Sequence, residues 1–328
     1  EDDLDICYTP DYLSLFTSSD IQGSLFVYKK NNDIWCLPIL KKKILFDKEF
    51  DSYFDIETPY GYGGPICNTV SNDFNKEAAN QFINWCKKQK VVSFLFKLNP
   101  FVFDQNKYLT KLKSYLEFDR VIVGANFEKD QNIENIINFK VKNMINKAKK
   151  NGISITTDMN DKNFEDFKNI YINSMSDKKT SQFYFFDNNF FLKLKQICKK
   201  YGMLVLSKHK KETLGASIFL NFKRRSVYFL SASKKTKFST GVVNLIIYEA
   251  CKILAKNKIK LINFGGGRSK ETDDTLYLFK KKMGNDLRKF NIVKFVNNKR
   301  VYTRILSKFK NQNPINYEKK KNLLQPYN

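Results

Sequence analysis

Three strand-like segments follow one another closely in the second half of this 328-residue chain: "MLVLSKH", "LGASIFLNF" and "SVYFLSAS". Only the charged turns 210–212 and 223–225 separate them, which predicts consecutive antiparallel strands. An apolar stripe at helical spacing then covers about 241–257, and the strand "IKLINF" follows it. Strands succeeded by a helix and a further strand predict a mixed sheet with helices packed on it. The fold class is therefore α/β.

The first half of the chain has a similar order of elements. The strands "SLFVYKK" and "DIWCLPIL" flank a hairpin turn at Asn31-Asn32, and "VVSFLFKL" and "RVIVGANF" follow later. Helices are expected over 73–89, 106–117 and 132–151. In the second half, helices are expected over 161–175 and 188–201, with late strands at "KFNIVKFV" and "RVYTRIL". We interpret the two halves as a weak internal repeat.

Composition excludes several classes of protein. Hydrophobic residues make up 42% of the chain, enough for a packed core, and no apolar run approaches the roughly 20 residues needed to span a bilayer. The six cysteines are scattered and His209 is the single histidine, so a zinc site is not expected. We expect a reduced, cytoplasmic protein. The sequence starts at Glu1 rather than methionine, which we interpret as loss of an N-terminal segment.

Positive charge is concentrated in one region. The formal net charge is +25, and residues 199–237 contain eleven Lys and Arg but one acidic residue, Glu212. A lysine-rich coding bias and a phosphate-bearing partner are both consistent with this excess. Such a partner is tRNA, a nucleotide-sugar, CoA or an anionic lipid.

The common nucleotide-binding and hydrolase motifs are missing. Gly265, Gly266 and Gly267 follow a strand, but Lys270 stands where a P-loop needs its second glycine, and no Rossmann G-x-G-x-x-G occurs. His209 lies in a lysine-flanked turn, which favours a solvated side chain over a Ser-His-Asp triad. The glycine run is either a bare turn or a place where something approaches the backbone closely.

Five segments, taken in order, resemble the FemAB family. They are "PYGYGGP" (59–65), "FKVKNMINKAKKNGISIT" (139–156), "FYFFDNNFFLKL" (183–194), "GASIFLNFKRRSVYFLSAS" and "GGGRSKETDDTLYLFKKKMG". This family consists of acyltransferases with two GNAT folds that add amino acids from aminoacyl-tRNA to peptidoglycan precursors, with relatives in surface-polysaccharide gene clusters. The resemblance covers most of the chain. It implies tandem GNAT-like domains, 1–140 on the acceptor side and 141–328 with the donor site and the C-terminal strands.

The chain departs from the family pattern in two places. No heptad run interrupts 156–183, so the coiled-coil arm of some members has no room. Gly63-Gly64-Pro65 stands where close peptidoglycan enzymes carry a basic residue before Gly-Pro, which argues against their usual cell-wall substrate. In CoA-dependent GNAT enzymes a glycine-rich loop before the central helix holds the pyrophosphate through backbone N–H groups. The equivalent stretch here, 231–241, has one glycine at its end, which favours aminoacyl-tRNA over acyl-CoA as donor.

The resemblance implies an N-acyltransferase that forms an amide on an amine of a sugar or sugar-linked cell-envelope glycan precursor, without a tightly bound cofactor or metal. One alternative is an acetyl-CoA-dependent or other acyl-CoA-dependent sugar N-acetyltransferase of polysaccharide biosynthesis. A second is a non-catalytic basic nucleic-acid-binding protein. The expected partners are a nucleotide- or lipid-linked sugar, tRNA, and an anionic membrane surface, with the protein peripheral to the inner membrane face.

The resemblance also assigns site residues. Lys280 and Phe279 match the family's Phe-Lys pair: Lys280 is expected to stabilise charge on the carbonyl oxygen or a phosphate, and Phe279 to exclude water. The expected substrate-binding residues are Tyr60, Gly61, Tyr62, Gly63, Gly64, Tyr184, Gly265, Gly266, Gly267 and Arg268. The expected donor-binding residues are Lys234, Lys235, Lys237, Thr240 and Asn244.

Each assignment has a structural alternative. Residues 58–65 can be a tight surface turn, and 234–237 a solvated charged loop. The run 280–282 can be a solvated cluster near a helix C-terminus, where cations are favoured. Thr240 or Ser239 is expected to cap the 241–257 helix, and Thr272 or Asp273 the helix near 273–283. Three carboxylates are candidate general bases by neighbourhood only: Asp55, Glu57 and Asp187.

Overall fold

The closely spaced strands of the second half form an antiparallel meander in the computed structural model. β8 (Gly202–His209) pairs with β9 (Glu212–Phe222), which pairs with β10 (Arg225–Ser233). Each tight turn contains a lysine with positive φ, Lys210 at 56° and Lys223 at 51°. The expected meander is confirmed, with both turns at the charged segments.

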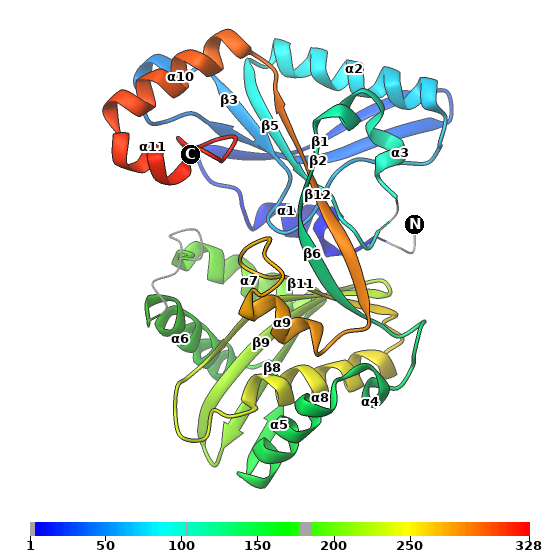
Figure 1. Cartoon of the computed structure of the whole chain (residues 1–328), viewed down its shortest axis with the longest axis vertical. Helices are drawn as coiled ribbons and strands as arrows, with labels where there is room; N and C mark the ends of the chain where they lie inside the picture. The colour runs from blue at the N-terminus through cyan, green and yellow to red at the C-terminus, as the bar shows by residue number, and fades with distance from the viewer. Residues whose placement is uncertain (1–3, 103, 178–184) are drawn as a thin grey trace. The chain divides into compact units, whose positions relative to one another are not determined.

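The chain divides into two compact units. Unit 1 is Arg120–Lys289 with the N-terminal residues up to Ile6, and unit 2 is Cys7–Asp119 with Phe290–Asn328. This division differs from the one expected at residue 140, because two long strands, β6 (Leu116–Asn126) and β12 (Asp286–Val296), each pass from one unit into the other (Figure 1). The structure describes residues 4–102, 104–177 and 185–328.

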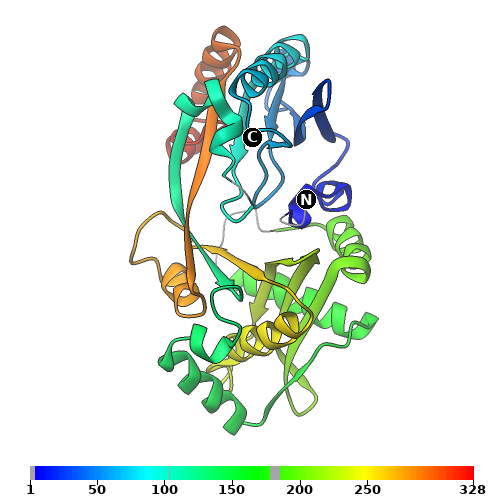
Figure 2. The ribbon, with the colours of Figure 1, turned by 90° about the vertical axis from the view of Figure 1, so that its right-hand side faces the viewer.

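The sheet of unit 1 has the strand order β6-β11-β10-β9-β8-β7, with β11 at Leu261–Gly266 and β7 at Ile153–Thr156. Its helices are α4 (Ile133–Ile136), α5 (Phe139–Lys150), α6 (Asp161–Asp177), α7 (Asn188–Tyr201), α8 (Val242–Lys256) and α9 (Thr275–Lys281). α5 and α8 pack on one face of the sheet, and α6 and α7 on the other (Figure 2).

Side-chain alternation explains why both faces of this sheet are covered. Val205 on β8 lies in the core formed with α5 and α8. Its neighbours Leu204 and Leu206 are also fully buried and point to the opposite face. α5 contributes a stripe at helical spacing, Val141, Ile145 and Ala148. A strand buried on both faces reads as a continuous apolar run, as "MLVL" does.

The sheet of unit 2 has the order β1-β2-β3-β5-β12, with β4 paired to β2. The strands are β1 (Ile21–Lys30), β2 (Asp33–Lys43), β3 (Phe54–Glu57), β4 (Ile66–Cys67) and β5 (Val91–Lys97). The helices are α1 (Pro10–Ser14), α2 (Asn72–Lys88), α3 (Asn106–Leu109), α10 (Lys299–Gln312) and α11 (Pro314–Lys320), with short 3-10 turns at Ile6–Tyr8, Lys48–Phe50 and Thr110–Tyr115.

Two apolar clusters hold unit 2 together. α2 presents Phe74, Ala78, Phe82 and Cys86, which pack with Trp35 and the strand residues of β5. α10 presents Val301, Ile305 and Phe309 to a separate cluster that includes Ile44 and Val92.

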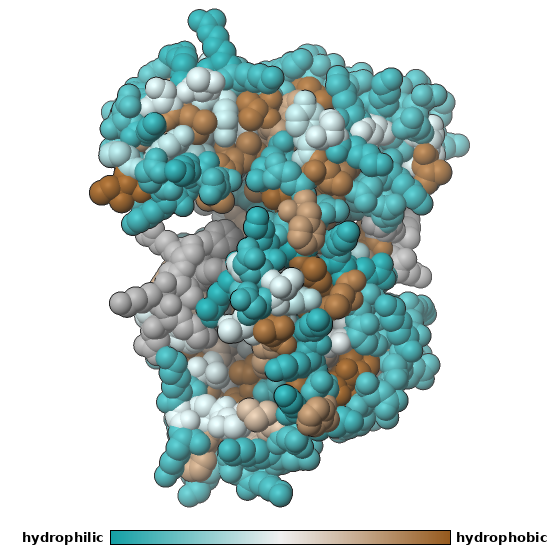
Figure 3. Space-filling model, in the orientation of Figure 1, coloured by the Kyte–Doolittle hydropathy of each residue, from teal (hydrophilic) through white to brown (hydrophobic). Residues whose placement is uncertain are grey.

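On the face drawn in Figure 3 the surface is mainly hydrophilic, with apolar residues interspersed. Within the described parts of the chain, no helix is long and apolar enough to cross a membrane.

Several expected elements differ from the structure. "RVYTRIL" is part of α10 and not a strand, because its apolar residues recur every four positions and Asn298 caps it by accepting from Val301 N at 3.1 Å. The helix expected over 132–151 is two helices, since Asn138 caps α5. The segment 106–117 is α3 with a 3-10 turn and then the start of β6. The assignment of helix or strand was wrong where a short apolar run fitted both the helical and the strand period.

Asp55, a candidate general base, is fully buried in unit 2. One carboxylate oxygen accepts hydrogen bonds from Ser93 N at 3.1 Å and Ser93 Oγ at 2.7 Å, and the other accepts from Asn328 Nδ2 at 2.9 Å. Burial raises its pKa to about 6, although these hydrogen bonds oppose the shift. The carboxylate therefore binds strand β3 to strand β5 and to the C-terminal segment.

We expect this carboxylate to make stability depend on pH. An unfolded aspartate has a pKa of about 3.9, so between about pH 4 and 6 the folded chain binds the additional proton and stability falls as pH rises. Asp55→Asn lacks this titration. Urea midpoints measured at pH 4.5 and pH 7 should show wild type losing stability relative to the variant. Parallel behaviour at the two pH values would contradict the assignment.

Candidate active site

Strands β10 and β11 are parallel neighbours that separate after a short contact. They pair only between Arg225–Val227 and Leu261–Asn263. Beyond that point β10 continues with β9 as far as Ser233, whereas β11 continues with β6 as far as Gly266. Each strand has a register shift near the point of separation. The later halves of the two strands therefore do not hydrogen-bond to each other, and the glycine run ends one of them.

The glycine run is crowded by other residues of unit 1. Gly265 has φ of 78° and its N–H donates to Asn263 Oδ1 at 2.8 Å. A Cβ on Gly266 would lie 2.8 Å from Arg120 Cδ, and one on Gly267 would lie 2.4 Å from Asp274 Oδ1. The carboxylate beside Gly267 leaves no room for a side chain there, whereas a side chain at Gly266 would have to displace the Arg120 side chain. The groups that approach this backbone are the chain's own charged side chains.

Asp274 organises the loop between β11 and α9. Its carboxylate accepts hydrogen bonds from the backbone N–H groups of Tyr277 (2.8 Å), Arg268 (3.0 Å) and Ser269 (3.2 Å). Burial would raise the pKa of Asp274, but these hydrogen bonds outweigh it and the pKa lies below its usual value. Asp274 is thus the N-cap of α9, and the expectation of Thr272 or Asp273 is wrong. At position 274 one carboxylate satisfies both the helix end and the loop.

Lys280 lies on α9 with its ammonium directed back to the glycine run. Nζ donates to Gly266 O at 2.8 Å, and no carboxylate of the described residues forms an ion pair with it. Burial, together with the positive charge of Arg120, lowers the pKa of Lys280 to about 8, although the Asp274 carboxylate opposes the shift. Lys281 and Lys282 are exposed, unlike Lys280. An ammonium has three donors, so this one retains capacity for a ligand.

Arg120 was not singled out by the sequence. Its Nη1 donates to Gly267 O at 2.7 Å, so the two glycine carbonyls each face a cation. Arg120 precedes an apolar strand segment, where a basic residue is ordinary, and no motif marked it. Phe279, the expected partner of Lys280, is partly buried against the apolar core of unit 1. Arg268 has an exposed side chain, and its N–H is used by Asp274.

The expected donor residues are divided between two places. Lys234 forms an ion pair with Glu212 at 2.8 Å, and Lys235 and Lys237 are exposed, Lys237 lying 5.2 Å from the ring centre of Phe238. Asn244, by contrast, is near the end of the Lys280 helix, since its Nδ2 lies 3.7 Å from Met283 Sδ. Asn244 is therefore brought toward the Lys280 region, while Lys234 is engaged elsewhere.

Gly241 begins α8, so the expectation of a Thr240 or Ser239 cap is wrong. Gly241 has φ of 80°, and a Cβ there would lie 2.1 Å from the carbonyl oxygen of Met144 on α5. Ser239 instead accepts from Thr236 N and donates to Lys234 O, which closes the loop on itself. Thr240 is half-buried. The glycine at this helix start serves the packing of α8 on α5.

The expected acceptor segment is a packed turn of unit 2. Tyr62 is 7% exposed and meets Phe290 edge-on at 5.5 Å, so truncating it would remove core packing. Gly63 O accepts from Tyr8 OH (2.6 Å) and Gln105 Nε2 (3.0 Å). Tyr60 O accepts from Tyr12 OH at 2.8 Å. Gly61 and Gly64 have φ of 84° and 92°. Tyr184 lies outside the described residues.

Two candidate general bases have structural partners. Glu57 accepts from Lys97 Nζ at 2.6 Å and also pairs with Lys42. Burial lowers the pKa of each of these lysines to about 8. Asp187 caps α7 by accepting from Phe190 N at 2.7 Å. Both carboxylates are therefore engaged in contacts within the fold, Glu57 with two lysines and Asp187 with a helix N-terminus.

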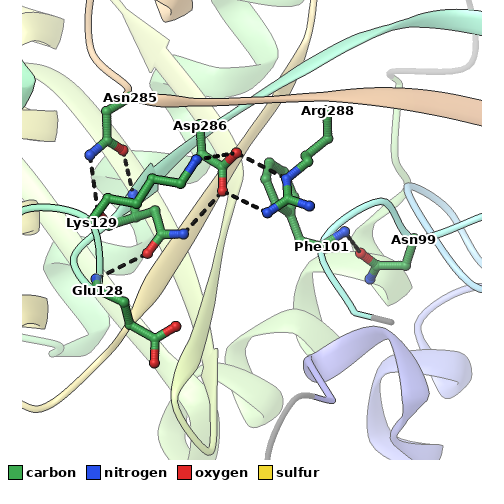
Figure 4. A network of polar contacts seen from close by, with 8 residues as sticks. Asn99, Phe101, Glu128, Lys129, Asn285, Asp286 and Arg288 are labelled. Carbon is green, nitrogen blue, oxygen red and sulfur yellow. Dashed lines mark hydrogen bonds and ion pairs between the residues drawn. The ribbon is translucent and has the colours of Figure 1, made fainter. Parts of the chain in front are cut away.

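A second polar network, which sequence reasoning missed, anchors the segment after α9. The Asp286 carboxylate is 2% exposed and accepts from both Arg288 Nε (2.9 Å) and Nη2 (3.1 Å), from Lys129 Nζ (3.0 Å) and from Asn126 Nδ2 (3.0 Å) (Figure 4). Asn285 adds hydrogen bonds with the backbone of Asn126 in both directions. The network fixes the start of β12 to the end of β6.

Comparison with known proteins was made by sequence and by structure. No family model and no curated protein matches the chain. Among solved structures, FemX has a TM-score of 0.70 and 13% identity over 92% of this chain and 94% of that chain. The chain has the FemAB-like tandem GNAT fold. The expected α/β class and tandem GNAT-like organisation are confirmed.

Other solved structures share this fold. L-PGS from Bacillus licheniformis has a TM-score of 0.57 and 11% identity, with 90% of each chain covered. A tandem GNAT protein from the clavulanic acid biosynthesis pathway has a TM-score of 0.51 and 6% identity, with 85% of each chain covered. At these identities the likeness is one of fold.

We predict that Gly241→Ala destabilises the protein more than Gly152→Ala. Both glycines have positive φ, 80° and 71°, so both variants pay the left-handed backbone cost of about 1–2 kcal/mol. At Gly152 the nearest atom is 3.9 Å away, whereas at Gly241 the Met144 carbonyl blocks the added carbon. Overpacking should add about 1–3 kcal/mol at Gly241. Urea unfolding of both variants measures this difference, and equal losses would contradict it.

Proposed function

We propose that this protein is an N-acyltransferase that transfers an activated acyl group to an amine on a sugar or sugar-linked precursor of a cell-envelope glycan. The fold supports this class, because the solved structures that share it include a tandem GNAT protein and a domain titled as that of a putative lysylphosphatidylglycerol synthetase. Fold alone does not determine function. The proposal therefore depends on the chemistry around Lys280.

One observation carries the proposal: the Lys280 ammonium is half-buried with a lowered pKa, and its one hydrogen-bond acceptor among the described residues is a carbonyl, Gly266 O. Burying a cation without an anionic partner costs free energy, so a partly buried, unpaired ammonium indicates a functional role. α9 is capped by Asp274 at its start, and the segment after it is fixed by the Asp286 network. The lysine is thus preorganised from both sides, as stabilisation of developing charge requires.

The reaction that fits is aminolysis of an acyl ester or thioester. The amine nitrogen attacks the acyl carbonyl carbon, an N–C bond forms, and the C–O or C–S bond to the donor breaks. The proton lost by the amine leaves with the departing oxygen or sulfur. Lys280 donates a hydrogen bond to the carbonyl oxygen as it becomes negative. Placing the amine against the carbonyl can supply about 7–11 kcal/mol, and the charged donor about 3–4 kcal/mol more.

We propose aminoacyl-tRNA as the donor. A pyrophosphate cradle needs free backbone N–H groups at the start of the central helix. Here the loop before α8 is closed by Ser239, and its glycine packs against α5. Acyl-CoA is the second candidate, because β10 and β11 separate beside α8 and leave a gap in the pairing of two parallel strands. Transfer assays with each donor distinguish the two.

We predict that Lys280→Met lowers acyl transfer by about 10²-fold or more, as loss of a charge-stabilising donor does. Lys281→Met and Lys282→Met are matched controls, since they remove the same charge from exposed neighbours on the same segment. The melting temperature of Lys280→Met should stay the same or rise, because the desolvated ammonium is not paired with a carboxylate. Equal, small losses at all three positions would refute a catalytic role for Lys280.

Activity should also depend on the ionisation of Lys280. Its pKa lies at about 8, below the ordinary 10.5, and the protonated form is the active one. The kcat/KM should therefore be retained below about pH 8 and fall above it. In Lys280→Arg the guanidinium remains charged, so a weaker activity should persist to higher pH. Initial rates from pH 6.5 to 9.5 test this, and identical falling limbs in the two proteins would oppose it.

A further inference from the structure

A basic cavity of about 680 Å³ lies in unit 1 at the C-terminal end of α8. Its walls come from the end of α8 and the following loop, the β9–β10 turn, and the segment between β6 and α4. α4 packs beside this part of α8 (Figure 1). The Lys280 site is associated instead with the other end of α8, through Asn244 and Met283. A helix of this length separates its two ends by about 20 Å.

Three cations on the wall of this cavity have no carboxylate partner among the described residues: Arg224, Lys256 and Lys258. Two further lysines do have partners. Lys260 pairs with Glu128, and Lys252 lies 3.5 Å from Glu249. The C-terminus of α8 itself carries only about half a negative charge. Three uncompensated positive charges exceed what that helix end needs, so the cavity attracts an anion.

The remainder of the wall is apolar apart from Glu128, which pairs with Lys260, and two amides, of which Asn132 accepts from Glu134 N. Phe127 and Ile259 are buried residues that line the cavity, and Ala255 lies on the same side of α8. Gln131 is exposed on the wall, with no side-chain hydrogen bond to another described residue. An apolar floor suits a planar ring, and a carboxamide can read the hydrogen-bonding edge of a base. The volume falls within the range of small-molecule sites.

We propose that this cavity, which we call the Arg224 cavity, binds a nucleotide, with the phosphate held by Arg224, Lys256 and Lys258 and the base placed over Phe127 and Ile259. The nucleotide is either free or one unit of an RNA strand, because both present the same phosphate, ring and base edge. A bilayer surface fits less well, since the cations surround a concavity and not a protruding face. The site is separate from the Lys280 site and does not depend on the proposed acyl transfer.

Binding is tested on the full chain without any acyl donor. The probes are AMP, UDP, inorganic phosphate and a fluorescent single-stranded ten-nucleotide RNA, titrated at 50 and 200 mM salt. We expect AMP or UDP to bind and to compete with the RNA if free nucleotides are the ligand. If the RNA alone binds, the ligand is a strand. In both cases affinity should fall with salt, as phosphate contacts require.

The charge variant is Arg224→Gln with Lys256→Gln and Lys258→Gln. Its matched control is Lys140→Gln with Lys147→Gln and Lys150→Gln, which removes the same charge from exposed positions on or beside α5. The charge variant should weaken binding at least tenfold and the control less than twofold. Ala255→Glu, which places an anion on the floor, should also abolish binding while α8 stays folded.

Gln131→Ala separates the two halves of the site. It should weaken nucleotide binding severalfold and leave inorganic phosphate binding unchanged. Equal effects of the charge variant and its control would overturn the proposal, as would absence of binding by every nucleotide probe. Binding of phosphatidylglycerol vesicles that is lost in the charge variant, without nucleotide binding, would assign the cavity to lipid and also overturn it. None of these measurements depends on acyl-transfer activity, so they test the cavity independently of the proposed function.

Discussion

The Asp274 carboxylate is the interaction on which the Lys280 site depends. A short helix such as α9 cannot form without tertiary support, and Asp274 supplies it by accepting from Tyr277, Arg268 and Ser269 at once. The same carboxylate excludes any side chain at Gly267. The helix cap, the loop and the glycine therefore depend on the same carboxylate, and together they determine where the Lys280 side chain points. A shift of the cap would move the Lys280 ammonium away from Gly266 O.

This arrangement determines which backbone groups the glycine run presents. A glycine-rich turn after a strand usually suggests backbone N–H groups held open for a phosphate. Here the carbonyls of Gly266 and Gly267 face Lys280 and Arg120, so the run presents acceptors and not donors. The positive charge offered to a ligand comes from the side chains. The positive charge of Arg120 near Lys280 also lowers the pKa of Lys280, which makes its ammonium a stronger hydrogen-bond donor than that of an ordinary lysine.

The sequence predicted the parts of the fold that local periodicity determines. The meander, α2, α8 and the late strand β11 follow from apolar spacing and turn residues. The domain boundary was not predictable in this way. β12 carries the chain from unit 1 back into unit 2, so a single boundary residue does not describe the two units. Lys280 was found through a family motif. Arg120 and Asp286 were not, because Arg120 meets Gly267, and Asp286 meets Lys129 and Asn126, only once segments distant in the sequence are brought together.

Most of the chain's positive charge attracts anions without orienting them. Most lysines are exposed or paired, such as Lys234 with Glu212, and contribute to a general attraction for anions. General attraction falls with the screening length of about 8 Å at physiological salt, so it brings a polyanion near without orienting it. Orientation requires cations that are gathered at one place and have no carboxylate partner. In the described part of unit 1 the half-buried Lys280 and the exposed cations around the Arg224 cavity meet this condition, and they are associated with opposite ends of α8. A rigid helix between them fixes their separation, so a ligand that reached both would have to span about 20 Å.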